Sequence, residues 1–133
     1  MPEHVHLLVF PVNKSASDIE DVLKAIKRPY SYRIKQILLT NASPLLDRLT
    51  IRQRPGIETF RYWQEGPGYD RNLYSPKAVT NSINYLHENP VRRGLCRRTT
   101  EWRWSSARWY ASDGKEIDAA LPTLTQIPPE FWG

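Results

Sequence analysis

The stretch S-P-K-A-V-T-N-S-I-N-Y-L-H-E-N-P, residues 75–90, decides how this chain is organised. Serine followed by proline is typical of the N-cap and first turn of a helix, so we predict that a helix begins there. Because the residue before a proline disfavours helical geometry, we expect this helix to end by Asn89. Its apolar face, at helical spacing, is expected to consist of Val79, Ile83 and Leu86.

A second stripe runs beside this apolar face. Its members are spaced i, i+4, i+7 and i+11, which places them on one side of the predicted helix. They are Ala78, Ser82, Tyr85 and Asn89. A tyrosine hydroxyl is a poor nucleophile at neutral pH, because its reference pKa is about 10. It can still attack a phosphodiester whose oxygens a metal ion has polarised, which would leave a phosphotyrosine link.

The chain opens M-P-E-H-V-H-L-L-V-F, residues 1–10. In a β-strand His4 and His6 share one face, and both faces are otherwise apolar, so the pattern predicts a central strand buried on both sides. The two imidazoles are either a satisfied polar patch or half of a metal site. If the predicted helix packs against their face, the Asn89 carbonyl oxygen would complete a two-imidazole, one-oxygen site for a divalent ion.

A plainer interpretation of both patterns stays open. Tyr85 can be a half-buried helix tyrosine and Asn89 an ordinary residue at a helix end before proline. H-x-H and Y-x-x-x-N are both common patterns, so spacing by itself favours this plainer interpretation.

The formal net charge of +5 is unevenly distributed along the chain. Residues 1–50 carry seven Lys and Arg against five Asp and Glu, residues 51–110 carry eleven against five, and residues 111–133 carry one against four. Ten of the eleven central cations are arginine, whose planar fork binds phosphate bidentately and stacks on bases. The central block therefore indicates a polyanionic partner, with a solvated basic surface as the alternative.

Aromatic and basic residues alternate in two parts of this block, residues 60–71 and 91–110. Such interleaving is typical of surfaces that stack unpaired bases and hold phosphates, although tryptophan also packs in protein cores. We expect a nucleic acid as the partner. The residues expected to contact it are Arg61, Trp63, Arg71, Arg92, Arg93, Arg97, Arg98, Trp102, Arg103 and Trp104.

The other elements are predicted from caps and breakers. Ser17 and Glu20 form a capping-box pattern for a helix that Pro29 is expected to end or kink, with a second helical stretch to about Leu39. Residues 40–57 are expected to be irregular apart from one helical turn at 45–49. The alternation over residues 60–64 predicts a strand.

Length and composition set further bounds. A chain of 133 residues is expected to fold without disulfides, and the single Cys96 excludes an intramolecular one. Neither a membrane span nor a signal peptide is evident, so we expect a soluble protein of the cytoplasm.

Four segments occur in a specific order and spacing: M-P-E-H-V-H-L-L, Y-W-Q-E-G-P-G-Y-D-R-N-L, Y-L-H-E-N-P-V-R-R-G-L and W-R-W-S-S-A-R-W-Y. In these segments the chain resembles the single-tyrosine HUH transposases, most closely the REP-associated tyrosine transposases of bacteria. The likeness runs from Pro2 to about Tyr110. We therefore expect a transposase domain over residues 1–110 and a peripheral tail over residues 111–133.

The resemblance implies an α+β fold, a ferredoxin-like antiparallel sheet with helices on one face. It also implies a nuclease that cuts and rejoins single-stranded DNA beside palindromic hairpins, at the bacterial nucleoid. His4 and His6 match the pair that holds Mg²⁺ or Mn²⁺, Asn89 matches the third ligand, and Tyr85 matches the nucleophile that keeps the 5′-phosphate.

One departure from the family pattern has consequences. In the family a strand, a helix and a further strand precede the H-x-H segment, so this chain is expected to be N-terminally truncated. A catalytically inactive DNA-hairpin-binding protein is therefore the first alternative, and a homodimer that restores the sheet by pairing two chains is another expectation. A third hypothesis is an unrelated basic structural domain whose histidines are core residues.

Overall fold

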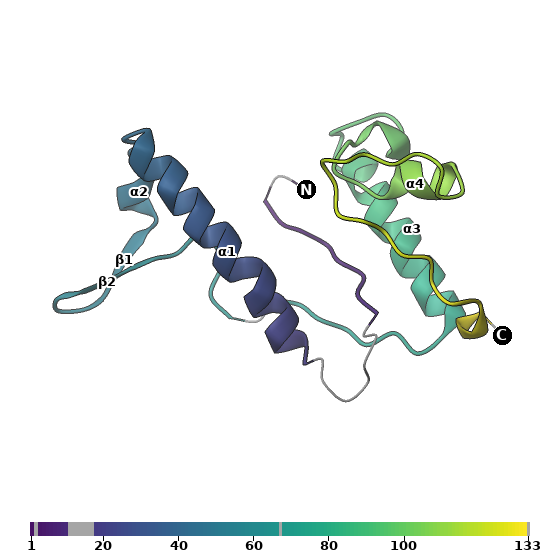
Figure 1. The fold of residues 1–133 in the computed structure, drawn as a ribbon, viewed down its shortest axis with the longest axis horizontal. Helices are drawn as coiled ribbons and strands as arrows, with labels where there is room; N and C mark the ends of the chain where they lie inside the picture. The colour runs from purple at the N-terminus through teal and green to yellow at the C-terminus, as the bar shows by residue number, and fades with distance from the viewer. Residues whose placement is uncertain (2, 11–17, 67, 133) are drawn as a thin grey trace. The chain divides into compact units, whose positions relative to one another are not determined.

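The computed structural model describes residues 1, 3–10, 18–66 and 68–132 of the chain (Figure 1). It is an α+β structure, as predicted, and it divides into two compact units, Met1–Phe10 with Asn72–Gly133, and Pro11–Arg71. The elements in chain order are α1 (Ile19–Thr40), α2 (Leu45–Arg48), β1 (Thr50–Arg54), β2 (Ile57–Phe60), α3 (Pro76–Arg92), the 3₁₀ turn η1 (Thr99–Glu101), α4 (Ala107–Ala111) and the 3₁₀ turn η2 (Pro129–Phe131).

In the unit Pro11–Arg71, helix α1 is longer than predicted. The Asp18 side chain caps it by accepting a hydrogen bond from the Glu20 amide at 3.2 Å, whereas the predicted cap Ser17 lies outside the described residues. The helix continues through Pro29 to Thr40, so the prediction that Pro29 could end it is wrong. A proline removes one hydrogen bond of the ladder, and a helix of 22 residues retains the others.

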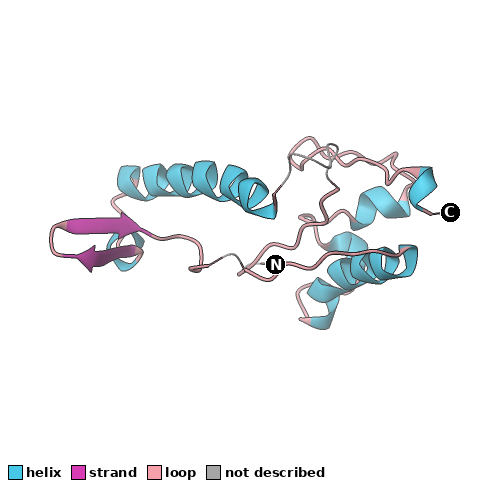
Figure 2. Cartoon of the chain, turned by 90° about the horizontal axis from the view of Figure 1, so that it is seen from below, coloured by secondary structure: helices cyan, strands magenta, loops and turns pink. Residues whose placement is uncertain are grey.

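The same unit contains a hairpin that was not predicted (Figure 2). β1 and β2 pair antiparallel, with Thr50 opposite Phe60 and Ile51 opposite Thr59, and Gly56 adopts a φ of 79° in the turn. The prediction of an irregular chain over residues 40–57 is thus wrong for its second part, although the helical turn is confirmed as α2. Pro55 and Gly56, the two residues between β1 and β2, form the turn of this hairpin.

The strand predicted over residues 60–64 is absent from the structure beyond Phe60. Instead, Tyr62 and Trp63 pack against Tyr30 of α1, with ring centroids 5.4 Å from it in both cases. The Trp63 indole nitrogen also donates to the Lys27 carbonyl at 3.2 Å. Packing against the helix, rather than strand pairing, explains why aromatic residues occur here.

In the other unit, α3 ends one turn later than predicted. It includes Pro90 and closes in a Schellman motif, in which the Gly94 amide donates to Val91 and the Leu95 amide donates to Pro90, both at 2.9 Å. The prediction of an end by Asn89 is therefore wrong. Gly94 supplies the required positive φ of 69°, and a proline in the last turn removes only one ladder bond.

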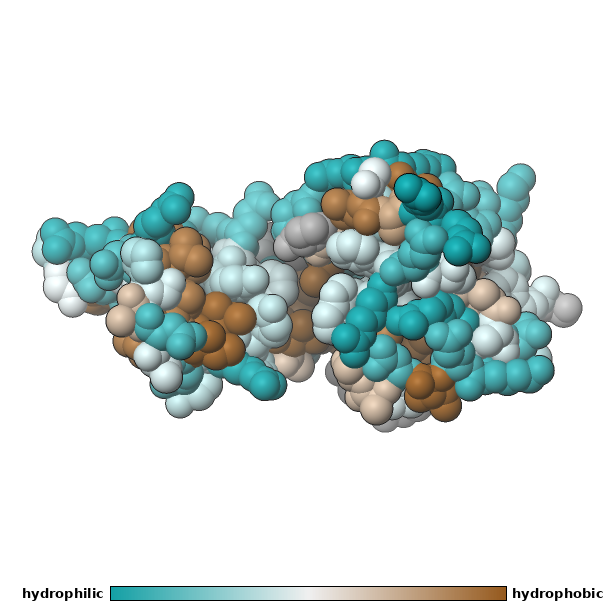
Figure 3. Space-filling model, turned by 90° about the horizontal axis from the view of Figure 1, so that it is seen from above, coloured by the Kyte–Doolittle hydropathy of each residue, from teal (hydrophilic) through white to brown (hydrophobic). Residues whose placement is uncertain are grey.

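The small core of this unit lies along α3. Val79 and Ile83 of the predicted apolar face are buried, Ala107 of α4 is buried with them, and Leu86 is half-buried. Many other apolar side chains reach the surface, as the brown atoms of Figure 3 show.

Residues 3–10 are extended but do not form the buried central strand that the sequence predicts. Figure 1 shows them as a single trace, and they pair with no strand among the described residues. Val5 and Phe10 are 59% and 54% exposed. Burial of a strand on both faces needs neighbours on both faces, and in the part of the chain that the structure describes the only sheet is β1–β2.

The start of the predicted tail contacts the preceding segment. Asp118 pairs with Arg103 at 3.2 Å and Glu116 with Arg108 at 3.3 Å. At Gly114, whose φ is 79°, an added Cβ would lie 3.3 Å from the Trp109 ring.

We expect Gly114→Ala to lower the melting temperature more than Gly94→Ala. Both positions need a positive φ, so alanine strains both, by about 1 kcal/mol. Only at Gly114 does the new methyl group meet an aromatic ring, because nothing lies within 4 Å of a Cβ at Gly94. Thermal unfolding followed by circular dichroism measures both losses, and equal losses would contradict the contact with Trp109.

Candidate functional site

The structure brings the three predicted metal ligands together. The His4 and His6 Nε2 atoms lie 3.0 Å apart, and their rings meet edge to face with centroids 4.6 Å apart. The Asn89 amide nitrogen lies 2.9 Å from His6 Nε2, although the two residues are 83 positions apart in sequence. Asn89 is 8% exposed, so the amide occupies a buried position on α3.

Two neighbours compete for a single nitrogen atom in this cluster. His6 Nε2 carries either one proton or one lone pair, yet both His4 Nε2 and the Asn89 amide lie within 3.0 Å of it. The oxygen and nitrogen of an asparagine amide exchange places by a flip, so Asn89 can present its oxygen instead. Two imidazole nitrogens and one amide oxygen would then converge, which is a donor set that fits a divalent cation.

The third ligand would have to be this amide. Among the described residues, no group of three or more His, Cys, Asp and Glu side chains could hold a metal ion. Desolvation, and after it the nearby charges of His4 and the N-terminus, lower the pKa of His6 below its ordinary value. The same surroundings therefore favour the neutral imidazole, the form that coordinates a metal.

Glu3 is a site residue that the sequence patterns did not single out. Its carboxylate forms an ion pair with Arg93 from the end of α3, and it lies 3.8 Å from His4 Nδ1. Its own backbone amide, more than the charges of Arg93 and His4, holds the pKa of this carboxyl below its ordinary value. A carboxylate beside the second ring nitrogen orients a metal-binding histidine. The sequence shows Glu3 next to His4, but only the fold shows its contact with Arg93.

Tyr85 stands one helical turn before Asn89, as its spacing predicts. Its ring meets the His6 ring nearly edge to face, with centroids 5.8 Å apart. The Arg92 guanidinium lies 6.0 Å from the centroid of the Tyr85 ring. Because Tyr85 is 49% exposed, a ligand of the size of a nucleic-acid strand has access to it.

Seven of the ten predicted DNA contacts belong to the same unit as Tyr85. Most of their cations are anchored by a nearby acid: Arg92 by Glu88, Arg98 by Glu101 and Arg103 by Asp118. Trp104 is exposed, with the Arg103 guanidinium 5.1 Å from its ring centroid, and Trp102 is half-buried. The seven residues are Arg92, Arg93, Arg97, Arg98, Trp102, Arg103 and Trp104.

The remaining three, Arg61, Trp63 and Arg71, belong to the unit Pro11–Arg71. Arg61 pairs with Glu65 at 2.7 Å, and the ring of Trp63 packs as described above. Arg71 is exposed.

Glu101 organises the arginines that follow α3. One of its oxygens accepts from the Arg97 and Arg98 amides at 2.9 and 3.1 Å, and the other accepts from Arg98 Nε at 3.0 Å. The side-chain bond from Arg98, and then these amides, lower the pKa of Glu101 below its ordinary value. The sequence showed Glu101 only as the single acid among many arginines.

Comparisons of the chain with protein-family models, with curated proteins and with solved structures gave no match. Among the described residues, no helix is both long and apolar enough to cross a membrane. A functional conclusion therefore rests on the geometry of the chain's own side chains.

We expect the stability that Glu101 contributes to depend on pH. Its folded pKa is lowered, so the contribution is present above its unfolded pKa of 4.5 and is lost as pH falls through the lower folded value. Glu101→Gln should therefore melt below the wild type at pH 7, and the difference should shrink in acid. Glu130→Gln is the control, since Glu130 forms no ion pair within the described part of the chain. A difference independent of pH would contradict the ionic role.

Proposed function

We propose that this protein is a metal-dependent DNA strand transferase of the transposase type, which cuts and rejoins single-stranded DNA near hairpins. The observation that carries the proposal is the convergence of His4, His6 and Asn89 beside the ring of Tyr85. A tyrosine next to a cation-binding donor set, within an arginine-rich unit, is what attack on a phosphodiester requires.

In this proposal Tyr85 is the nucleophile. Its hydroxyl oxygen attacks the scissile phosphorus and its proton passes to solvent. The bond from phosphorus to the 3′-oxygen breaks, and that oxygen takes a proton from solvent to become a 3′-hydroxyl. The 5′-phosphate stays on Tyr85 until a 3′-hydroxyl attacks it in the reverse reaction. The exchange of one phosphodiester for another needs no nucleotide cofactor.

His4, His6 and Asn89 would hold Mg²⁺ or Mn²⁺. When bound, such an ion polarises the phosphate oxygens and stabilises the charge that develops on them. These three residues include no carboxylate, so we expect them to bind such an ion weakly and a DNA phosphate to strengthen the binding.

Ion pairs that hold two arginines near the site support DNA as the partner. Arg92 and Arg93 stand three and four residues after Asn89, as the last residue and the C-cap of α3, and each is held by an acid, Glu88 or Glu3. Fixed guanidinium groups next to Tyr85 lose less conformational entropy on binding a phosphate than free ones do. A DNA substrate would place the protein at the bacterial nucleoid.

The alternative function is hairpin binding without cleavage. One observation favours it: residues 3–10, which carry both histidines, pair with no strand in the described ranges. The segment is held at the site by side-chain contacts of Glu3 and His6. In a homodimer, a second copy of the chain would pair with this segment and hold it further.

We expect Mn²⁺ to bind the wild type and to bind His4→Ala and Asn89→Ala about tenfold more weakly or worse. Titration calorimetry or the Mn²⁺ electron paramagnetic resonance signal measures the affinity. His87→Ala is the matched control, because His87 is also on α3 but contacts Ser106 at 2.9 Å instead. Equal Mn²⁺ affinity in all four proteins would refute the site.

Covalent capture tests the nucleophile. A 3′-labelled single-stranded hairpin oligonucleotide incubated with Mn²⁺ should give a labelled band of protein size on a denaturing gel. Tyr85→Phe and EDTA should abolish this band, whereas Tyr74→Phe, an exposed tyrosine of the same unit, should retain it. Hairpin binding by folded wild type without any adduct would establish the alternative function and exclude strand transfer.

A further inference from the structure

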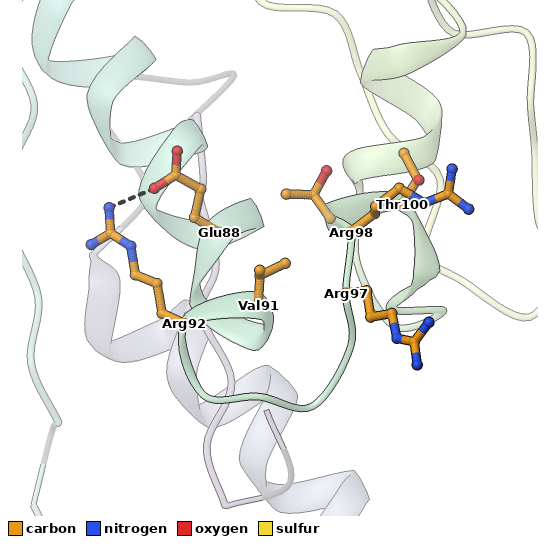
Figure 4. A pocket seen from close by; sticks show the side chains of 7 residues that line it. Glu88, Val91, Arg92, Arg97, Arg98 and Thr100 are labelled. Atoms are coloured by element: carbon orange, nitrogen blue, oxygen red, sulfur yellow. Dashed lines mark hydrogen bonds and ion pairs between the residues drawn. The ribbon is translucent and has the colours of Figure 1, made fainter.

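An open pocket of about 450 Å³ lies between the last turns of α3 and the turn η1. Figure 4 shows Val91 projecting between two walls, with Glu88 and Arg92 on one side and the segment carrying Arg97 and Arg98 on the other. Thr99 and Thr100 complete the lining. None of the sequence patterns pointed to this pocket, because its walls come from two elements joined by the turn at Gly94.

The chemistry of the pocket changes from its centre to its rim. The lining is mostly apolar, and Val91, Thr99 and Thr100 contribute to it, so two hydroxyl groups belong to the pocket residues. The guanidinium groups of Arg97 and Arg98 point away from Val91 in Figure 4, so positive charge lies along the outer edge of this wall. Two of the three pocket arginines form ion pairs. Arg92 pairs with Glu88, which also lines the pocket, and Arg98 pairs with Glu101, which does not.

One arginine connects this pocket with Tyr85. Arg92 lines the pocket, its guanidinium pairs with Glu88, and the same guanidinium lies 6.0 Å from the Tyr85 ring centroid. Glu88 also follows Tyr85 by three residues, which places both on one side of α3. A DNA strand with a phosphate at Tyr85 therefore has its neighbouring nucleotide within reach of the pocket.

We propose that this pocket holds one unpaired nucleotide of the DNA strand, with its base over Val91 and its flanking phosphates at the arginine rim. A nucleobase has apolar faces and polar edges, which match the apolar centre and the threonine hydroxyls. The rim matches the two phosphates that flank any nucleotide. The inference rests on the proposed DNA partner, but not on catalysis.

Binding without metal tests the pocket apart from cleavage. The probe is a dye-labelled DNA hairpin with an unpaired extension. The protein is titrated into the probe in the presence of EDTA, and binding is followed by fluorescence anisotropy. In a series of further probes, an abasic nucleotide replaces each unpaired nucleotide in turn. We expect one abasic position to weaken wild-type binding about tenfold. In Val91→Trp, which fills the pocket, the intact probe should bind as weakly as that abasic probe, and the abasic change should have no further effect.

Charge at the rim is tested separately, in a variant that leaves the packing intact. Within the described residues the Arg97 guanidinium has no hydrogen-bond partner, so its loss should not disturb the fold. Arg97→Gln should lower the slope of log affinity against log salt by about 0.7, the value for one contact on a single strand. Lys77→Gln, at the opposite end of α3, removes the same charge and should leave the abasic effect unchanged.

The outcomes separate the two proposals. If the wild type binds the hairpin but no abasic position matters, or if Val91→Trp binds like the wild type, the pocket inference falls while strand transfer by Tyr85 stands. If the wild type binds no hairpin, both fall. Tighter binding of the RNA version of the probe would overturn the assignment to DNA.

Discussion

The contact between the Asn89 amide and the His6 imidazole is the interaction on which the candidate site depends. It joins a buried position on α3 to the extended segment at residues 3–10, which has no strand partner among the described residues. Around it, Glu3 binds Arg93 and the His6 ring meets Tyr85. Together these contacts align the histidines with the tyrosine. Because Asn89 is buried, loss of its His6 partner would leave a buried amide group without a hydrogen bond, which is costly.

Ion pairs organise the arginines more than they stabilise the fold. The pairs Arg92–Glu88, Arg98–Glu101 and Arg103–Asp118 are largely exposed, and exposed pairs contribute little to the free energy of folding. Each instead restricts where a guanidinium can be. This arrangement suits a surface that binds phosphates at defined positions, and it explains why acidic residues occur within the most basic part of the chain.

The local patterns predicted the helices well and the strands poorly. The Ser–Pro start of α3, its apolar face at Val79 and Ile83, and the short helix α2 follow from caps and periodicity, which act over a few residues. The hairpin β1–β2 was missed because its residues lack clear alternation. Pro29, which was expected to end or kink its helix, and Pro90, which was expected to follow the end of the other, both lie inside helices; the second helix ends at the turn that Gly94 makes.

What the sequence determined by itself is the order and chemistry of the site residues: an H-x-H pair, a tyrosine one helical turn before an asparagine, and an arginine-rich block after them. Helical periodicity is local, so it places Tyr85 and Asn89 on one stripe without a fold. Only the tertiary structure decided that His6 meets Asn89, that Glu3 joins Arg93, and that Val91 faces η1 across a pocket. These contacts join residues of different elements. Such residues meet because the chain reverses direction and its elements pack together, and no local sequence pattern encodes either.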